Sequence, residues 1–159
     1  MEKNLNYLIN KANILRKHVI EMVARQGKGY VQQGLGASDL FSVLFFNELK
    51  NINIVSNINR DRFFLSTAHN SALFHATMAE KGLINIDSLE DYCLDGSPLE
   101  INVSERLGPF VEATCGSLGQ GLSVAIGMAL SAKRRKLNSR FYVILGDGEL
   151  QEGQTWEAI

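Results

Sequence analysis

Asp147 lies between two glycines, in the stretch Gly146-Asp147-Gly148, directly after the apolar segment 141–145. Glycines let a backbone approach a ligand closely, and a carboxylate at the end of a buried strand can hold a hard cation such as Mg²⁺ beside phosphate oxygens. An ordinary Asp turn or a helix N-cap is the alternative, because turns favour the same residues. On this motif alone both interpretations stay open.

A second motif, TCGSLGQGL (114–122), places three glycines just before an apolar helical segment. Free N–H groups and the helix dipole at such a start favour a phosphate. The spacing Gly-x-x-Gly-x-Gly is not the dinucleotide fingerprint, and the Lys-Ser/Thr of a P-loop is absent. Tight helix packing is the alternative explanation for these glycines.

His69 is the histidine best placed for chemistry, in the segment LSTAHNSAL (65–73), where a short strand turns into a helix. A helix cap or a satisfied core histidine is the alternative. We expect His75 to be structural, and we expect His18, mid-helix beside Lys17, to face solvent. None of the three is diagnostic by itself.

Charged residues show no global bias toward one kind of partner. The 16 basic and 17 acidic residues give a net charge of −1, which provides no general attraction to nucleic acid or to an anionic membrane. KRRK (133–136) is interpreted as the basic end of a helix. Glu149, Glu152 and Glu157 follow Asp147. Favourable charge at a helix N-terminus is the simplest interpretation of all three, and it is the default for Glu157.

The elements that must position these residues follow from periodicity. Apolar spacing predicts a long helix from Leu5 that ends near Gly27 and Gly29. The glycine-rich stretch 27–36 predicts a loop, with a second helix starting near Ser38. Further helices are predicted from about residue 72 to Gly82 and over 87–92, and the segment 94–110 is predicted to be mainly an ordered loop.

Strands are predicted over 62–66 and 140–148, and the segment 122–136, apolar on nearly all sides, predicts a buried helix. Alternating helices and strands indicate the α/β class with a parallel sheet flanked by helices. Ligands bind at the carboxyl ends of such strands. Both polar clusters, Ser66–Asn70 and Gly146–Glu149, follow a strand, so we expect them at that edge.

Composition favours an ordinary soluble protein. The first residues lack the apolar core of a signal peptide, and no apolar run approaches the ~18 residues of a membrane span. Cys93 and Cys115 are far apart and outside any Cys-x-x-Cys pair, which is typical of reduced thiols. We therefore expect a cytoplasmic protein that binds neither membrane nor nucleic acid.

Taken together, the motifs resemble the N-terminal, diphosphate-binding part of transketolases, in the form that is split into separate N- and C-terminal subunits. Three blocks carry the resemblance, in the family's order: RDRFFLSTAHNSALFHATMAEKGL (60–83), ATCGSLGQGLSVAIGMALSAK (113–133) and FYVILGDGELQEGQTWEA (141–158). The resemblance covers essentially the whole chain. It implies the thiamine diphosphate-binding fold, with residues 1–159 as part of one domain that is incomplete at its C-terminal end and no second domain.

The resemblance also implies cofactors and a reaction: thiamine diphosphate with Mg²⁺ or Ca²⁺, and transfer of a two-carbon ketol unit between sugar phosphates. The protein's part in such chemistry is to position the cofactor and stabilise charge. The metal ligand implied is Asp147, and the catalytic residues implied are His69 and Glu152, with Glu152 in an acidic network near a dimer interface. The cofactor-binding residues implied are Gly116, Ser117, Leu118, Gly146, Gly148 and His69.

The sequence departs from the family pattern in three places. One is Thr67-Ala68, where the family commonly has Lys/Asn-Gly before His69, and the others are Tyr30 and Ser97. Tyr30 and Ser97 stand where the family has histidines that serve substrate binding, and neither side chain titrates near neutral pH as histidine does. The resemblance therefore assigns Tyr30 and Ser97 to the substrate region, with an altered choice of sugar phosphate.

The length of the chain leads to a further expectation. The sequence ends at Ile159, before the Asn that supplies another metal ligand in the family and before the pyrimidine-binding domain. We expect the chain alone to be inert, and to need a C-terminal transketolase subunit in a dimeric assembly whose active site lies between chains. The alternatives are a non-catalytic remnant or interaction module of the same fold and a nucleotide-binding protein.

Overall fold

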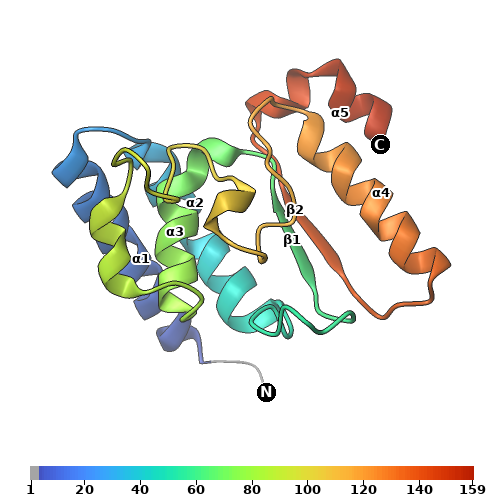
Figure 1. Ribbon diagram of the computed structural model, residues 1–159, viewed down its shortest axis with the longest axis horizontal. Coiled ribbons are helices and arrows are strands. Elements are labelled where there is room, and N and C mark those ends of the chain that lie inside the picture. The colour runs from blue at the N-terminus through green and yellow to red at the C-terminus, as the bar shows by residue number, and fades with distance from the viewer. Residues whose placement is uncertain (1–3) are drawn as a thin grey trace. The chain divides into compact units, whose positions relative to one another are not determined.

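The computed structural model describes residues 4–159 and divides into two compact units. Unit 1 is Met1–Leu49 with His69–Ile101, and unit 2 is Lys50–Ala68 with Asn102–Ile159. The three longest helices of unit 1 and the paired strands of unit 2 are labelled in Figure 1. Within residues 4–159, no helix combines the length and the apolar character needed to cross a lipid bilayer.

Unit 1 is built on α1 (Leu5–Gln26), as its apolar spacing predicts. The side chain of Asn4 caps the first turn by accepting from the N–H of Asn6, and Gly27 ends the helix in the left-handed conformation at φ 63°. The predicted end near Gly27 is therefore confirmed. The other elements of unit 1 are α2 (Val31–Val43) with a π-helical turn (Leu44–Glu48), α3 (Ser71–Glu80) and a 3₁₀ turn (Ile86–Asp91).

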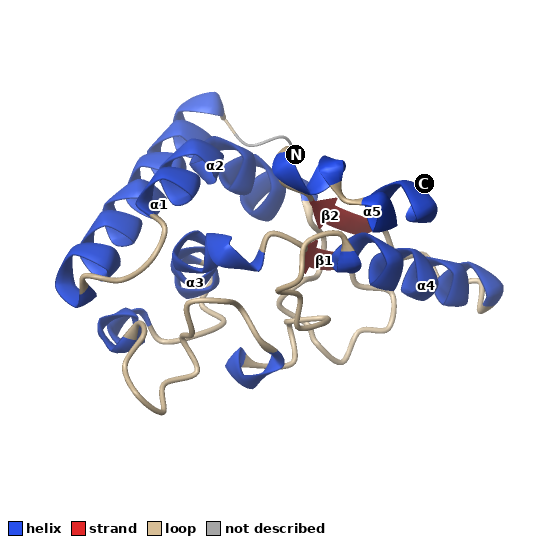
Figure 2. Cartoon of the chain, turned by 90° about the horizontal axis from the view of Figure 1, so that it is seen from above, coloured by secondary structure: helices blue, strands red, loops and turns tan. Residues whose placement is uncertain are grey.

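The prediction of a loop over residues 27–36 is wrong in its second half, because α2 begins at Val31. Gly34 is buried, and a β-carbon there would lie 2.8 Å from a methyl of Val19 on α1. Glycine at this position lets α1 and α2 pack closely, and the two helices lie side by side in both views of the chain (Figures 1 and 2). Its role is helix packing, and it does not break the helix.

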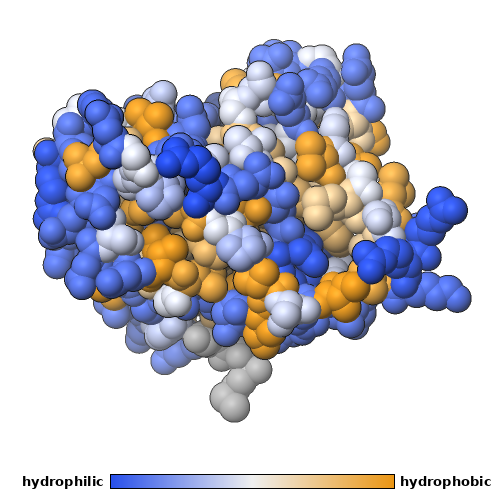
Figure 3. All heavy atoms as spheres, viewed as in Figure 1, coloured by the Kyte–Doolittle hydropathy of each residue, from blue (hydrophilic) through white to orange (hydrophobic). Residues whose placement is uncertain are grey.

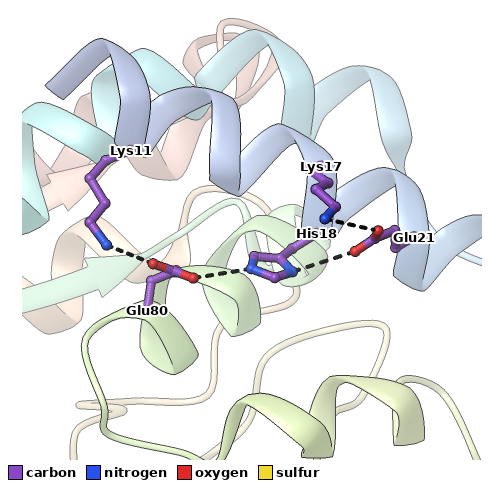
Figure 4. Close-up of polar contacts among 5 residues, drawn as sticks. All are labelled: Lys11, Lys17, His18, Glu21 and Glu80. Carbon is purple, nitrogen blue, oxygen red and sulfur yellow. Dashed lines mark hydrogen bonds and ion pairs between the residues drawn. The ribbon is translucent and has the colours of Figure 1, made fainter. Parts of the chain in front are cut away.

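A polar network joins α1 to the end of α3 (Figure 4). Glu80 accepts from Lys11 Nζ at 2.7 Å and lies 3.1 Å from His18 Nε2. Burial acts to raise the pKa of Glu80, but the hydrogen bonds and charges of Lys11 and His18 outweigh it and hold that pKa below its usual value. His18 is therefore half-buried against a carboxylate, and the prediction that it faces solvent is wrong.

Unit 2 contains two parallel strands, β1 (Arg62–Leu65) and β2 (Phe141–Ile144), with Phe64 opposite Val143 and Leu65 opposite Ile144. Both were predicted, and their parallel pairing confirms the α/β class. The helices of unit 2 are α4 (Gln120–Arg134) and the short α5 (Gly153–Ala158), with 3₁₀ turns at Glu105–Leu107 and Gly148–Gln151. Figure 2 shows α4 beside the strands that it contacts.

The prediction that the segment 122–136 forms a buried helix is wrong for much of α4. Its buried residues are Gly121, Ala125 and Ala132, one stripe along the helix, whereas Val124 and Leu130 are 41% and 61% exposed. α4 contacts β1, β2 and α5, and its residues outside the buried stripe are exposed or half-buried. Apolar surface is visible in this region of the molecule in Figure 3.

A buried charge cluster ties the segment before α4 to the start of β1. Arg60, 1% exposed, pairs with Glu112, and Arg62 Nη1 lies 3.0 Å from the other carboxylate oxygen of Glu112. The guanidinium of Arg60 also donates to the carbonyl of Pro109 at 3.4 Å. These contacts give a long segment with little regular structure a fixed path, which agrees with the predicted ordered loop.

Candidate functional site

The carboxyl ends of β1 and β2 lie side by side, because the parallel register pairs Leu65 with Ile144. The pairing continues one residue further, where the N–H of Ser66 donates to the carbonyl of Ile144 at 3.1 Å. A β-carbon on Gly146 would lie 3.0 Å from the methyl of Thr67. Within unit 2, Ser66 and Thr67 of the first predicted cluster therefore lie beside Gly146 of the second at one edge of the sheet.

The Gly146-Asp147-Gly148 motif forms a tight turn directly after β2. The N–H of Glu149 donates to the carbonyl of Gly146 at 3.1 Å, and the N–H of Leu150 donates to the carbonyl of Asp147 at 3.2 Å. Asp147 and Gly148 are both exposed, and a β-carbon on Gly148 would meet no atom within 4 Å. The carboxylate of Asp147 is thus accessible to a ligand at the end of the strand.

Glu149 differs from its expected role as a charge at a helix start, because its side chain is buried, with 1% exposure. One carboxylate oxygen accepts from the hydroxyl of Ser66 and, at 2.7 Å, from the N–H of Gly119. The other oxygen accepts from the N–H of Gly146 at 3.2 Å. A single carboxylate therefore connects the end of β1, the start of α4 and the turn after β2.

Sequence patterns do not predict this arrangement. Ser66 and Gly119 lie 83 and 30 residues from Glu149 along the chain, so no local periodicity reports the contacts. A carboxylate that follows a strand end by only a few residues was the available signal. Its burial depends on partners that only the folded chain brings together.

The three glycines of the segment 114–122 serve different purposes. Gly119 is the N-cap of α4 at φ 86°, and a β-carbon there would lie 3.2 Å from the β-carbon of Glu152. A β-carbon on Gly121 would lie 2.5 Å from the hydroxyl of Ser66, so this glycine allows α4 to pack on β1. Gly116 has open space around it, and Gly116, Ser117 and Leu118 are exposed. Packing explains two of the glycines, and the first remains available to a ligand.

Glu152, predicted from the resemblance to act in an acidic network, is exposed at the start of α5. Its backbone N–H donates to the carbonyl of Glu149, and its own carbonyl accepts from the N–H of Thr155, each at 3.1 Å. Thr155 is fully buried and its hydroxyl donates to the carbonyl of Glu149 at 2.9 Å. The backbone of Glu152 is therefore fixed while its carboxylate faces outward.

The remaining predicted residues, Tyr30, His69 and Ser97, belong to unit 1. The rings of Tyr30 and His69 meet edge to face, with centroids 5.5 Å apart and planes inclined by 65°. Tyr30 is 41% exposed just before α2, and His69 is half-buried in the 3₁₀ turn Ala68–Asn70. The structure thus brings Tyr30 and His69 together. Ser97 instead accepts from the N–H of Leu99 at 3.1 Å, within a local turn.

A buried phenol lies beneath the first glycine loop and was not singled out from the sequence. Tyr92 is fully buried, and its hydroxyl lies 3.0 Å from that of Ser71. Burial raises the pKa of Tyr92 well above its usual value, so the phenol stays protonated. A β-carbon on Gly29, at φ 118°, would lie 2.7 Å from this hydroxyl, so the loop before Tyr30 requires a glycine here.

His75 is structural, as expected. It is fully buried in α3, and its Nε2 lies 2.9 Å from the carbonyl oxygen of Glu100, which can only accept, so Nε2 carries the proton. Burial lowers the pKa of His75 to about 4, against the raising effects of the Glu100 carbonyl hydrogen bond and the Glu100 charge. The imidazole is therefore neutral at pH 7.

The residues at the strand ends of unit 2 fit a phosphate with a hard cation. The hydroxyl of Thr67 is buried and has no hydrogen-bond partner in the structure, which leaves a polar atom for a ligand. Among residues 4–159, no group of three or more His, Cys, Asp or Glu side chains could hold a metal ion. A Mg²⁺ on Asp147 would therefore complete its shell with phosphate oxygens, water or backbone groups, as Mg²⁺ commonly does.

The parallel strands place the chain among α/β proteins, whose ligands bind at the carboxyl edge of the sheet, where this chain has an exposed Gly-Asp-Gly turn and an open glycine loop. The sequence comparison is more specific. Residues 9–159 match the family described as "Transketolase, thiamine diphosphate binding domain". The chain belongs to this family, and its fold is the α/β thiamine diphosphate-binding fold.

Individual relatives agree with this assignment. The chain is 39% identical over 152 residues to a transketolase family protein of Sinorhizobium fredii, covering 95% of this chain and 54% of the relative. It is 36% identical over 156 residues to a 6-deoxy-6-sulfo-D-fructose transketolase subunit of a Clostridium strain, covering 95% of this chain and 55% of the relative. The chain spans about half the length of these curated relatives.

A solved structure shows the same fold. The transketolase of Campylobacter jejuni superposes with a TM-score of 0.88 at 31% identity, over 98% of this chain and 26% of that chain. The resemblance to transketolases stated from the three sequence blocks is therefore confirmed.

Proposed function

We propose that this chain is the N-terminal, cofactor-binding part of a transketolase-type enzyme that transfers a two-carbon ketol unit between sugar phosphates. The observation that carries the proposal is the turn after β2, where Asp147 is exposed between glycines at the carboxyl edge of a parallel sheet. Membership of the thiamine diphosphate-binding family supports it. Thiamine diphosphate, when bound, would supply the carbanion chemistry of ketol transfer.

In this proposal Asp147 would hold Mg²⁺ or Ca²⁺, which would offset the negative charge of the diphosphate. Gly148 and the exposed segment Gly116–Leu118 approach the cofactor, since their surroundings leave room for a ligand, and Gly146 lies in the same turn as Gly148, close to Thr67. The hydroxyl of Thr67, buried without a partner, is a further candidate donor. These residues would bind and orient the cofactor, with the negative charge of its diphosphate fixed beside the turn after β2.

The proposal assigns His69 and Glu152 to the catalytic part of the site, and Tyr30 and Ser97 to the substrate region. Support for Tyr30 comes from its edge-to-face contact with the ring of His69. This contact places the proposed substrate residue beside the proposed catalytic residue within unit 1. Ser97 has weaker support, since its hydroxyl is engaged in a local turn. The identity of the sugar phosphate would be tested first with Tyr30 variants.

The assembly is also part of the proposal. One relative is named as a transketolase subunit, and this chain spans 55% of that relative. We propose that residues 1–159 belong to one diphosphate-binding domain that acts with a C-terminal transketolase subunit, in a dimeric assembly with its active site between chains. The 159-residue chain alone is then inert, and ketol transfer by the purified chain would contradict this point.

Paramagnetic NMR tests the metal site directly. Mn²⁺ replaces Mg²⁺ and broadens the amide signals of residues close to it, and even weak binding is detected in this way. With thiamine diphosphate present, we expect Mn²⁺ to broaden Asp147 and Gly148 in the wild type and about tenfold higher Mn²⁺ to be needed in Asp147→Asn. Asp95→Asn, an exposed residue of unit 1, is the matched control and keeps the wild-type response.

The same titration decides between the proposal and its alternative. If the wild type shows no broadening around Asp147, or if Asp147→Asn behaves as the wild type does, the turn is not a metal site. The chain would then be better described as a non-catalytic interaction module of the transketolase fold.

A further inference from the structure

Glu149 uses every polar group that it has. Its backbone N–H donates to Gly146, its carbonyl accepts from the hydroxyl of Thr155, and its two carboxylate oxygens accept from three donors. The side chain is 1% exposed, so none of these bonds is exchanged with bulk water. Such a fully satisfied buried carboxylate fixes the elements that it connects.

Two of these bonds link Glu149 to the same residue, Gly146, from opposite directions. The N–H of Glu149 donates to the carbonyl of Gly146 at 3.1 Å, and the N–H of Gly146 donates back to the carboxylate at 3.2 Å. Asp147 lies between the two residues. Its backbone position is therefore set by a closed pair of hydrogen bonds on either side of it.

The other carboxylate oxygen of Glu149 connects the turn to β1 and α4. It accepts from the hydroxyl of Ser66, at the end of β1, and from the N–H of Gly119, the N-cap of α4. Gly119 directly follows the exposed segment Gly116–Leu118. The turn that presents Asp147 and the loop that presents the open glycine are thus held by one anionic group.

We propose that Glu149 is a positioning residue for the diphosphate and its cation. It fixes the turn of Asp147 against the glycine loop without touching the ligand itself. This inference rests on the proposed function, and it adds a residue and a role that the sequence resemblance does not assign.

Glu149→Gln is the sharpest variant, because it preserves shape and changes only the pattern of donors and acceptors. A carboxamide has one acceptor oxygen and one NH₂ donor, whereas the site offers N–H donors on both sides. In either orientation, the NH₂ faces the N–H of Gly119 or that of Gly146 and leaves it unpaired. Leaving a buried donor unpaired has a large cost, so the turn or the loop must shift.

The first measurement needs no ligand. We expect amide hydrogen exchange at Gly119 or Gly146 to be about tenfold or more faster in Glu149→Gln than in the wild type. Glu157→Gln, the same chemical change at an exposed position of α5, is the matched control and leaves both amides unchanged. Unchanged exchange at both glycines in Glu149→Gln would overturn the inference.

The second measurement separates positioning from a general loss of stability. Mn²⁺ with thiamine diphosphate is titrated into Glu149→Gln and into Glu112→Gln, which removes a buried carboxylate at the amino end of β1. We expect about tenfold weaker Mn²⁺ binding at Asp147 in Glu149→Gln, and wild-type binding in the folded fraction of Glu112→Gln. Equal weakening in both variants would show that Glu149 acts only through stability, which overturns the inference.

Ser66→Ala provides a milder variant in case Glu149→Gln does not fold. It removes one of the three donors and leaves both glycine N–H bonds to the carboxylate. We expect Mn²⁺ binding weakened by about threefold, as for one hydrogen bond, and wild-type binding would count against the inference. If the wild type itself binds no Mn²⁺ at Asp147 while the exchange result holds, the proposed function fails and Glu149 is a structural residue only.

Discussion

Ser66 occupies the space in which a β-carbon on Gly121 would lie. Such a carbon would be 2.5 Å from the hydroxyl oxygen of Ser66 and 2.8 Å from its α-carbon. No side-chain rotation relieves a clash with a backbone atom. The first turn of α4 therefore packs directly on the end of β1, and glycine at residue 121 is a condition for the hydrogen bonds of Glu149 with Ser66 and Gly119.

Gly121→Ala should destabilise the protein although alanine favours helices. Overpacking against a backbone costs about 1–3 kcal/mol, and the gain in helix propensity offsets less than about 1 kcal/mol of it. Gly127→Ala in the same helix is the matched control, since its β-carbon would meet nothing within 4 Å, and it should raise the free energy of unfolding by about 0.5–1 kcal/mol. Urea denaturation measures both, and changes of the same sign would contradict the packing described.

Removing the carboxylate of Glu112 should be among the most damaging single changes in unit 2. Arg60 is 1% exposed and pairs with Glu112, so its charge would be left in the interior without compensation. We expect Glu112→Gln to lower the free energy of unfolding by about 3–5 kcal/mol. Glu157→Gln, at an exposed position, should change it by less than about 0.5 kcal/mol. Similar denaturation midpoints for the two variants would refute this expectation.

Stability should fall in mild acid because of His75. Burial lowers its pKa from 6.5 to about 4, so between these values the unfolded chain binds a proton that the folded chain does not. Above pH 6.5 both states are neutral at His75, and the free energy of unfolding is not reduced by this group. As the pH falls from 6.5 toward 4, the free energy of unfolding drops by roughly 3 kcal/mol. His75→Gln keeps a donor for the carbonyl of Glu100 and removes the titration. Its unfolding free energy should vary less over this range, and an unchanged pH dependence would exclude His75 as the cause.

Glu80 should contribute at a different pH from His75. The pKa of Glu80 is lowered, so its contribution is present above the ordinary value of 4.5 and is lost as the pH falls through the folded-state value. At pH 7, Glu80→Gln weakens the contacts with Lys11 and His18 and should cost about 1 kcal/mol. Glu21→Gln, whose side chain is 51% exposed, is the control and should cost less. Thermal unfolding of Glu80→Gln and Glu21→Gln at low and high salt would show whether the difference in stability between the two variants is electrostatic.

Periodicity and turn-forming residues in the sequence predict much of the fold. The apolar spacing of the first helix, its end at Gly27, the two short strands and the delivery of Asp147 to a strand end are local features, and all are present. Parallel pairing followed from the alternation of helices and strands. The predictions of single elements succeed because each depends on residues that are close in sequence, and the pairing of β1 with β2 succeeds because alternating helices and strands favour parallel neighbours.

The tertiary structure alone decided how several individual residues are used. Gly34 looked like part of a loop and instead lies in α2 against Val19, and His18 looked exposed and instead contacts Glu80. The helix after the glycine loop is apolar in sequence, yet Leu130 is 61% exposed. In each case, the deciding partner belongs to another element, and hydropathy along one element does not report it.

Glu149 shows the same division within the candidate site. The sequence by itself placed a carboxylate just after Gly146-Asp147-Gly148, for which charge at a helix N-terminus was the simplest interpretation. The fold buried it, because Ser66 and Gly119 are brought to within hydrogen-bonding distance of it from 83 and 30 residues away. Sequence therefore determined which groups stand at the strand ends. Long-range hydrogen bonding and burial decided that Asp147 is exposed while the carboxylate of Glu149 is buried.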